Sequence, residues 1–444
     1  MLYNIESDNS IKDQLIVAES FMKGSSAFKK SRINIKVAGK AAEVELIRSK
    51  KLEIDKLVLS ENVIKELMIP DKVQYQIRVE KGSIRIGPII GLLMTSERSR
   101  MSKSTLTKLL NYTLIYPEIG GLLVAFSTDI IDFENKSVEG YYYDSNFVGR
   151  GLPWVAGTFP IPESIFSRTM LSDDIMGQLQ EETNNKLFNS NFFNKWEFWK
   201  KISKSKRAVQ YLPKTSLYLD FKNLEDVVDK YGAAYLKPLN GTLSRGLYKV
   251  SKLEEGYGLQ PKQGEDMIKF STAEETAAYI KDEIVRNYKY IVQQAINPLR
   301  VKGRHMDFRV IMQKNETLDW QCTGIIALIG SRGDICSNWG STAYFEDIFY
   351  DEFNLTQKEI FKIKREIIGA CVSICKALES QKENYGDLGF DVVVDEDYKI
   401  WILEANKRHY HTVPLWINDV QTFYQTKANP IKYAAAQVGF RVYS

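Results

Sequence analysis

The chain has 444 residues, of which 44% are hydrophobic and 26% are charged. These fractions are typical of a globular protein and exclude a disordered chain, a collagen-like repeat or a disulfide-stapled scaffold. The formal net charge of +4 is too small to make nucleic acid the principal partner. Four cysteines without a CxxC pair indicate a reducing compartment, and three histidines are few for a histidine-based metal or triad enzyme.

No membrane span or leader is expected. The longest apolar runs, 86–94 and 119–126, fall far short of the roughly 20 residues that a membrane helix needs. The first residues include acids rather than the basic and apolar regions of a signal peptide. We therefore expect a cytoplasmic protein of about three domains.

Residues 1–100 are expected to form a β-rich N-terminal domain. A short helix is predicted within it at 59–70, with Ser60 at the N-cap position and Pro70 as its end. Strands are predicted where apolar and polar residues alternate, at 33–37, 42–46, 73–79 and 83–86.

A different pattern begins near residue 101. Residues 101–175 alternate helical and buried-strand signals, which favours a small α/β layer. Residues 176–444 hold the segments that point to chemistry. The helices predicted in this part of the chain include 223–230, 271–288 and 356–379. The last two begin with capping boxes.

A hairpin is predicted near the C-terminal end, with strands at 390–395 and 400–406. A two-residue turn between them would set Asp391 opposite Ile402 and make Glu404 its diagonal neighbour on the same face. A register shift of one residue would separate the two carboxylates onto opposite faces.

The polar residues of this hairpin suit a metal ion. Asp391, Glu404 and Asn406 would converge on one apolar face, where the carboxylates repel each other and are costly to bury. A hard divalent cation resolves both problems, and oxygen ligands favour magnesium over zinc. Taken alone, the pattern also fits an ordinary amphipathic hairpin.

A glycine-bearing turn follows a predicted strand that ends at Lys237. Two glycines surround Ser244 and Arg245, so backbone N–H groups can converge on an anion while the lysine adds a point charge. The order of a Walker A loop is absent, and the turn alone also fits a plain surface turn. Together with the carboxylate hairpin it describes a nucleotide site.

These features resemble the ATP-grasp superfamily, and in particular its endospore-coat-associated, YheC/YheD-like branch. The resemblance implies an α+β and α/β multidomain protein. Two α+β subdomains in residues 176–444 would clasp ATP, with the lid at about 210–292, preceded by a pre-ATP-grasp layer at 101–175. Seven segments in unbroken order carry the likeness: IGPIIGLL, FFNKWEFWKKIS, YLPKTSLY, YLKPLNGTLSRGLYKV, YIVQQAI, MDFRVIMQ and GFDVVVDEDYKIWILEAN.

The resemblance also implies roles for individual residues. Lys237 would reach the adenine and the α- and β-phosphates, and Arg309 would steady the γ-phosphate and the acyl phosphate. Lys195 or Lys200 would supply a second nucleotide-binding lysine. The other implied ATP contacts are the flap residues Gly241, Ser244, Arg245 and Gly246 and the hinge residues Gln293, Gln294, Ala295 and Ile296. The implied magnesium ligands are Asp391, Glu404 and Asn406.

Two segments depart from the pattern of related ligases. A small Gly/Pro turn usually follows Glu-x-Asn, but this chain has residues 407–411 of sequence KRHYH. A Gly-rich loop usually follows Ser-Asn, and here residues 339–342 replace it. Predicted substrate contacts are Arg332, Ser337, Asn338, Arg408 and His409, although either arginine also fits a solvated surface residue.

The resemblance implies an ATP-dependent carboxylate ligase. Magnesium would bridge phosphate oxygens, a carboxylate would become an acyl phosphate, and an amine would attack it to give an amide, ADP and phosphate. The substrates would be small-molecule or peptide carboxylates and amines, with a carrier-protein thiol as an alternative acceptor. A nucleotide-binding coat protein without turnover remains the alternative from another class, and a protein or peptide kinase is a more distant one.

The remaining cysteine and histidine patterns favour structural roles. Cys371 and Cys375 lie one turn apart among apolar residues of a predicted helix, which indicates core thiols. His409 and His411 alternate as a zinc pair would, but further ligands are not evident from the sequence.

Overall fold

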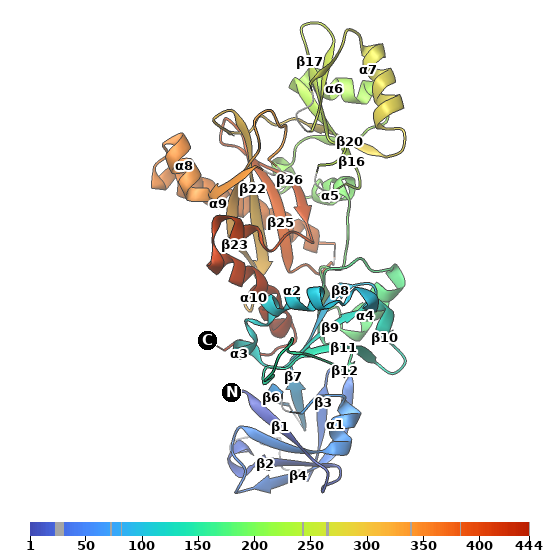
Figure 1. Ribbon diagram of the computed structural model, residues 1–444, viewed down its shortest axis with the longest axis vertical. Helices are drawn as coiled ribbons and strands as arrows, with labels where there is room; N and C mark the ends of the chain where they lie inside the picture. The colour runs from blue at the N-terminus through green and yellow to red at the C-terminus, as the bar shows by residue number, and fades with distance from the viewer. Residues whose placement is uncertain are drawn as a thin grey trace.

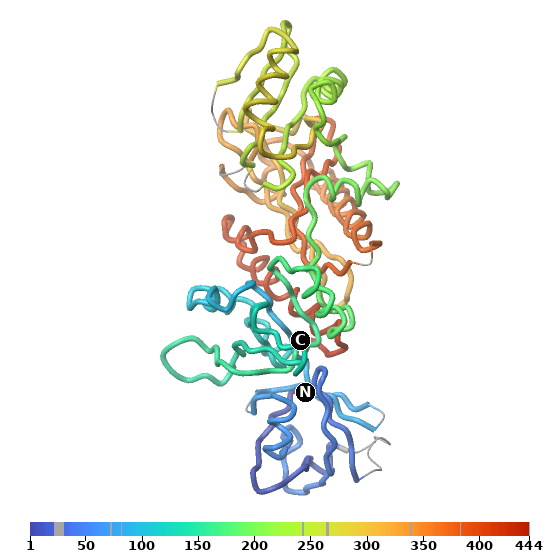
Figure 2. Tube along the Cα trace, turned by 90° about the vertical axis from the view of Figure 1, so that its right-hand side faces the viewer, coloured from blue at the N-terminus to red at the C-terminus, as the bar shows by residue number. Residues whose placement is uncertain are grey.

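The computed structural model describes residues 1–22, 31–71, 73–80, 82–241, 244–262, 266–337, 340–381 and 383–443. Within these ranges, four sheets succeed one another along an elongated molecule (Figures 1 and 2). A barrel lies at one end and an α/β sheet follows it. The sheet near the C-terminal end of the chain comes next, and the lid sheet lies at the other end. The predicted α+β and α/β multidomain class is confirmed.

The first sheet closes into a barrel in the order β1-β5-β2-β4-β3-β7-β6. Alternate residues of β3 are buried, as the period-2 pattern predicted. Ser60 precedes α1 but its side chain makes no cap bond; its Oγ instead accepts from the backbone N–H of Gln14. The bounds are β1 (Tyr3–Asp8), β2 (Gln14–Ala18), β3 (Arg32–Val37), β4 (Lys40–Ser49), β5 (Lys56–Ser60), α1 (Glu61–Leu67), β6 (Gln74–Glu80) and β7 (Ser83–Gly87).

The second sheet contains a parallel core, in which β8 lies between β9 and β13 and β14 pairs with β13. It runs from residue 89 to residue 188, whereas the predicted layer spanned 101–175, because the apolar run of β8 belongs here and not to the barrel. The bounds are β8 (Ile89–Thr95), α2 (Lys103–Thr113), α3 (Tyr116–Ile119), β9 (Leu122–Ser127), β10 (Ile131–Asp132), β11 (Ser137–Tyr143), β12 (Trp154–Pro160), β13 (Ser164–Ser167), α4 (Asp173–Glu182) and β14 (Leu187–Phe188).

The lid sheet is antiparallel and has its own core, into which α6 and the helical segment after β19 pack. The helix predicted at 271–288 is shorter: α7 ends at Tyr279 and continues as a π-helical turn, Ile280–Ile284. The bounds are β15 (Thr215–Leu217), α6 (Phe221–Tyr231), β16 (Ala233–Pro238), β17 (Tyr248–Lys252), β18 (Tyr257–Pro261), β19 (Ile268–Phe270), α7 (Ala273–Tyr279) and β20 (Tyr290–Gln294).

The remaining sheet has the order β24-β23-β22-β25-β26, with β21 paired to β22. The long helix α9 begins with the predicted capping box of Thr356 and Glu359, and Cys371 and Cys375 are buried in the core, as predicted. The bounds are α5 (Lys195–Ile202), β21 (Arg300–Val301), β22 (Arg304–Lys314), β23 (Trp320–Ile329), β24 (Ser341–Tyr344), α8 (Phe345–Phe353), α9 (Gln357–Glu379), β25 (Asp387–Val394) and β26 (Ile400–Asn406).

Helix α10 (Val420–Gln437) returns the chain to the second sheet. Its apolar residues, among them Ile431 and Ala434, join the core formed by α2, β8 and β9, so the last helix spans the predicted boundary between the ATP-grasp domain and the α/β layer. Short 3-10 turns lie at Glu19–Met22, Arg98–Arg100, Thr128–Ile130, Val209–Tyr211 and Val413–Ile417.

The C-terminal segment returns to the barrel, and both ends of the chain lie where barrel and α/β layer meet (Figures 1 and 2). Gln76 of the barrel is buried at this junction. Its Nε2 donates to the carbonyls of Ile119 and Arg441, each at 2.7 Å, and its Oε1 accepts from the N–H of Arg441 at 3.0 Å. One side chain thus joins three segments distant in sequence.

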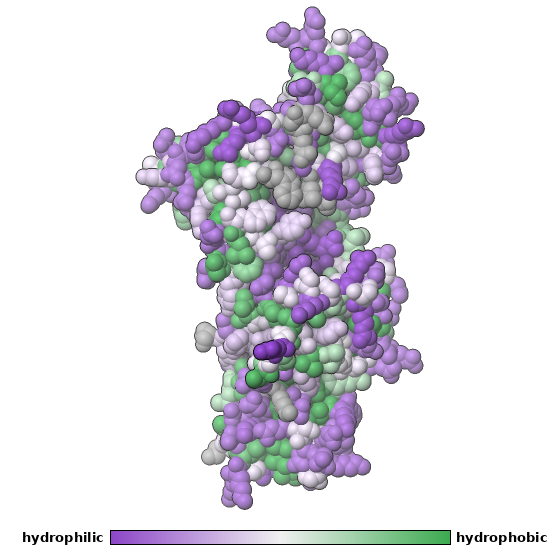
Figure 3. Space-filling view, in the orientation of Figure 1, coloured by the Kyte–Doolittle hydropathy of each residue, from purple (hydrophilic) through white to green (hydrophobic). Residues whose placement is uncertain are grey.

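Among the described residues, no helix has the length and apolar character to cross a membrane. In the face shown by Figure 3, hydrophilic residues predominate over the lid, and apolar residues are interspersed elsewhere.

Replacing Gln76 with alanine is predicted to lower the free energy of unfolding by about 2–4 kcal/mol, because buried carbonyl and N–H groups lose their partners. Chemical denaturation measures the change. Gln210→Ala, which removes an exposed hydrogen bond within one turn, is the control and should stay within about 0.5 kcal/mol of the wild type. Equal effects of the two substitutions would contradict the role assigned to Gln76.

Candidate active site

A cavity of about 570 Å³ is lined by residues of the lid, of the sheet that contains β22, β25 and β26, and of the α/β layer. Met94 and Arg168 come from the ends of the parallel strands β8 and β13, which is where ligands bind in open α/β sheets. The lid contributes Lys237 and Gln293, and the opposite sheet contributes its carboxylates. Three separate bodies therefore enclose one space.

The predicted metal-ligand residues converge here, but in another register. Asp391 pairs directly with Glu404, so the predicted pairing with Ile402 was wrong. Near the turn, Val394 pairs with Ile400, one residue away from the predicted register. A bulge between Val392 and Asp391 then adds a second shift of one residue. Two shifts of one residue restore the same face, so both carboxylates still point into the cavity.

The carboxylates are closely engaged by their neighbours. Asn406 Nδ2 lies 3.0 Å from Glu404 Oε1 and 3.3 Å from Asp391 Oδ2. Arg309, which pairs with Asp391 across β22 and β25, contacts Asp391 Oδ1 through Nε at 2.8 Å and a terminal nitrogen at 2.7 Å. Burial raises the pKa of Asp391 in spite of Arg309, and the Glu404 carboxylate raises it further. This set of oxygen donors fits Mg²⁺.

Two lysines line the same cavity. Lys237 Nζ donates to Gln293 Oε1 at 2.6 Å, and burial lowers the pKa of Lys237 to about 8. Lys195 Nζ donates to the carbonyl of Gly241 at 3.0 Å and lies 3.9 Å from Glu404 Oε2. Of the two alternatives for the second lysine, Lys195 lines the cavity, whereas Lys200 is exposed and lies over the ring of Trp196.

The predicted flap and hinge residues divide between the cavity wall and its support. Ala295 does not line the cavity; its N–H donates to the carbonyl of Ala233 at 3.1 Å. Gly246 is also outside the lining; its φ of 71° falls in the left-handed region that glycine tolerates. Lining the cavity are Gly241, Ser244, Arg245, Gln293, Gln294 and Ile296.

The predicted substrate contacts are only partly brought together. Arg408 and His409 line the cavity. Arg332 is exposed and does not line this cavity. Ser337 is buried and its Oγ donates to Asp307. Asn338 lies outside the described residues.

Asp307 is a cavity residue to which the sequence pattern assigned no role. It shares a strand face with Arg309, two residues further along β22, and its Oδ1 has no hydrogen-bond partner among the described residues. Burial raises the pKa of Asp307 to about 6. The signal was present in the i, i+2 spacing of Asp307 and Arg309, because alternate residues of a strand face the same way.

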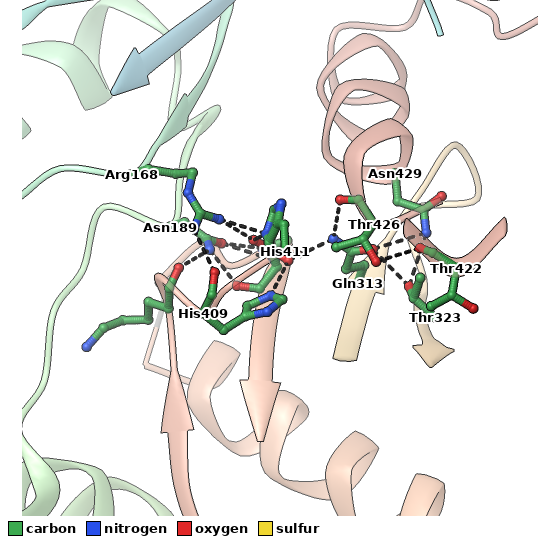
Figure 4. Close-up of polar contacts among 12 residues, drawn as sticks. Arg168, Asn189, Gln313, Thr323, His409, His411, Thr422, Thr426 and Asn429 are labelled. Atoms are coloured by element: carbon green, nitrogen blue, oxygen red, sulfur yellow. Dashed lines mark hydrogen bonds and ion pairs between the residues drawn. The ribbon is translucent and has the colours of Figure 1, made fainter. Parts of the chain in front are cut away.

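A second buried carboxylate, Asp387, lies on the same face of β25 as Asp391. Gln313 Nε2 donates to its Oδ1 at 2.8 Å, and Arg168 lies 3.2 Å from its Oδ2. His409 Nε2 and His411 Nε2 lie 2.9 and 2.7 Å from the two oxygens. Figure 4 shows Arg168, His409 and His411 converging, with Gln313 beside Thr426 of α10. Burial alone would raise the pKa of Asp387, but His411 and His409 hold it well below its usual value.

Asp387 is the further ligand that the sequence did not reveal for a zinc site at His409 and His411. The three candidate ligand atoms lie within 4.8 Å of one another. A terminal nitrogen of Arg168 nevertheless lies 2.7 Å from His411 Nε2. A guanidinium is always charged, so Arg168 already provides the positive charge that a metal would bring. The cluster is an ion-paired junction between the α/β layer and the loop after β26.

The fold and the arrangement of lysines, arginine and oxygen ligands define an ATP-grasp protein. A family model of YheC/D-like ATP-grasp proteins matches residues 184–436, and the chain belongs to that family.

The chain is also similar to two curated relatives and to two solved structures. The chain is 25% identical over 371 residues to the endospore coat-associated protein YheD of Bacillus subtilis (strain 168), covering 79% of each chain. It is 20% identical over 302 residues to YheC of the same strain, covering 66% of this chain and 82% of that one. D-alanyl-alanine synthetase A from Vibrio cholerae O1 biovar eltor str. N16961 is similar at 15% identity and a TM-score of 0.40, covering 72% of this chain and 88% of that one. The VanG D-Ala:D-Ser ligase from Enterococcus faecalis is similar at 12% identity and a TM-score of 0.42, covering 78% of this chain and 98% of that one.

Nucleotide affinity is predicted to fall as the pH rises through about 8, where Lys237 loses its proton. The charged ammonium attracts phosphate below this pKa, and losing one charge-assisted contact of ~1.5 kcal/mol weakens binding about tenfold. Calorimetric titration with ADP and magnesium measures this. The Lys237→Arg variant keeps its charge, so its affinity should change little over the same range; an equal decline in both proteins would contradict the assignment.

Proposed function

We propose that this protein is an ADP-forming ligase that activates a carboxylate as an acyl phosphate and joins it to an amine. One observation carries the proposal: a single cavity holds Asp391, Glu404 and Asn406 beside the cations Lys195, Lys237 and Arg309. This is the set of groups that phosphoryl transfer needs, because the protein's task there is positioning and charge stabilisation.

Each residue has a definite task in this reaction. Lys237 and Lys195 attract the polyphosphate, and Arg309 stabilises negative charge on the phosphoryl group as it moves. Asp391, Glu404 and Asn406 would hold Mg²⁺, which when bound neutralises charge on the phosphate oxygens. The flap residues Gly241, Ser244 and Arg245 lie against the same space and would exclude water that hydrolyses an acyl phosphate.

The carboxylate and amine would enter at the end of the cavity formed by the α/β layer. Arg408 is exposed and lines this end together with Arg168 and Met94. Its guanidinium, free of any carboxylate contact among the described ion pairs, suits a small-molecule or peptide carboxylate. A carrier-protein thiol is the alternative acceptor.

Glu404→Gln is predicted to lower turnover by about 100-fold or more, because a neutral amide holds a divalent cation poorly where several kcal/mol of charge stabilisation is needed. The measurement is a screen of carboxylates with ATP, magnesium and hydroxylamine, which traps acyl phosphate as hydroxamate and releases ADP. Glu396→Gln, an exposed change in the adjoining β-turn, is the matched control and should retain wild-type rates. Release of AMP and pyrophosphate would overturn the proposal.

A second candidate function is nucleotide binding without turnover in a coat-associated protein. The names of the two relatives, both endospore coat-associated, favour it, and so would a location at the spore rather than in the general cytoplasm. Tight binding of ATP with magnesium, without ADP release across the whole screen, would support this second candidate over the first.

A further inference from the structure

Strand β12 forms one edge of the α/β sheet. It pairs with β11 on one side and with no other strand among the described residues. All seven of its residues pair with β11 in one continuous register, without a bulge. A straight strand of this length with an open side can pair with a further strand.

Two hydrogen bonds show how the backbone of β12 is oriented. The N–H of Asp144 donates to the carbonyl of Pro153 at 2.9 Å, and the N–H of Ile161 donates to the carbonyl of Lys136 at 3.2 Å. In an antiparallel pair, alternate residues exchange hydrogen bonds with the neighbouring strand. The odd-numbered residues of β12 therefore direct their N–H and C=O groups towards β11.

The even-numbered residues of β12 direct these groups to the open side of the strand. They are Trp154, Ala156, Thr158 and Pro160. Pro160 has no N–H, so it ends the run of outward donors, as a proline at a sheet edge does. Ala156, Gly157 and Thr158 are all exposed, although successive residues of a strand face opposite ways. Neither face of the strand is therefore covered at its middle.

The other edge strands of the described sheets are short or covered. Strands β14, β15, β19 and β24 have two, three, three and four residues, and β26 packs against α5. Charged residues commonly keep an open edge from pairing, but β12, of sequence WVAGTFP, has none. Its composition is that of a strand that pairs.

The hairpin of β11 and β12 presents different groups at its two ends. In the loop that joins the strands, Phe147 and Val148 are 37% and 97% exposed, and Figure 2 shows this loop as a blue-green arm that stands out from the body. Arg150 of the same loop is exposed, and so is Glu134, in the turn before β11 at the opposite end. An antiparallel partner brings such opposite ends together.

We propose that β12 is a dimerisation edge, which pairs antiparallel with β12 of a second copy of this chain. A two-fold axis at Ala156 sets this residue opposite its own copy and Trp154 opposite Thr158. The outward N–H groups then meet outward carbonyls in about six hydrogen bonds. Because the strand is neutral, the two identical edges do not repel each other.

The same axis gives a reason why the partner is a second copy. It places the loop that contains Arg150 at the end of the second copy that contains Glu134, so opposite charges approach each other. A two-fold axis supplies both this match and the match of backbone groups twice, by symmetry. The dimer joins two α/β sheets into one continuous sheet, and it does not depend on the ligase function.

Light scattering after size-exclusion chromatography tests the proposal on the whole chain. The wild type should have twice the mass of one chain. Ala156→Lys should have the mass of one chain, because two like charges would face each other at the axis. Thr107→Lys, an exposed change on α2, is the matched control and should remain a dimer. A wild type that is a monomer at every concentration overturns the inference, as does a dimer that persists in Ala156→Lys.

A cysteine at the axis locates the contact. Opposite residues of a hydrogen-bonded antiparallel pair have Cα atoms about 5.5 Å apart, which lies within the range of a disulfide. Mild oxidation of Ala156→Cys should therefore give a covalent dimer on a non-reducing gel, whereas Thr107→Cys should remain a single chain. If Ala156→Cys gives no more covalent dimer than Thr107→Cys does, the edge is not the contact and the inference is overturned.

Discussion

The arrangement of the molecule depends on the buried carboxylate of Asp387, which is 0% exposed. An isolated carboxylate in the interior is strongly destabilising, so its partners must be held in place. Those partners come from separate segments of the chain: Arg168 from the α/β layer, Gln313 from β22, and His409 with His411 from the loop after β26. Asn189 holds the strand itself, because its Oδ1 accepts from the backbone N–H of Asp387. Satisfying one charge thereby determines how the layers meet.

The same strand transmits this constraint to the reactive end of the cavity. β25 lies between β22 and β26 in its sheet, and its alternation places Asp387 at the domain junction and Asp391 in the cavity. Gly389, between them, leaves room for the ring of His409. Removing one partner of such a buried charge typically costs 3–5 kcal/mol, so the junction and the reactive site are coupled through packing as well as through the backbone.

Much of this arrangement could be predicted from sequence, and the exceptions have physical causes. Period-2 alternation placed Asp391, Glu404 and Asn406 on one face, but the register was wrong because neither a longer loop nor a bulge leaves a clear local signal. Arg168 had no signal at all: it is 219 residues from Asp387 and meets it only through tertiary packing. The contact of His409 with Asp387 was equally hidden, because the two residues lie 22 apart in sequence and meet only in the folded chain. The lysine and glycine turn, by contrast, is contiguous in sequence and was found.

The central claim is that a carboxylate becomes an acyl phosphate in this cavity. It is tested most directly by supplying a carboxylate labelled with oxygen-18 together with ATP, magnesium and an amine, and analysing the products by mass spectrometry. Direct phosphoryl transfer places one labelled oxygen in inorganic phosphate and leaves ADP unlabelled. Label in AMP, which marks an adenylate, or phosphate without label would contradict the account.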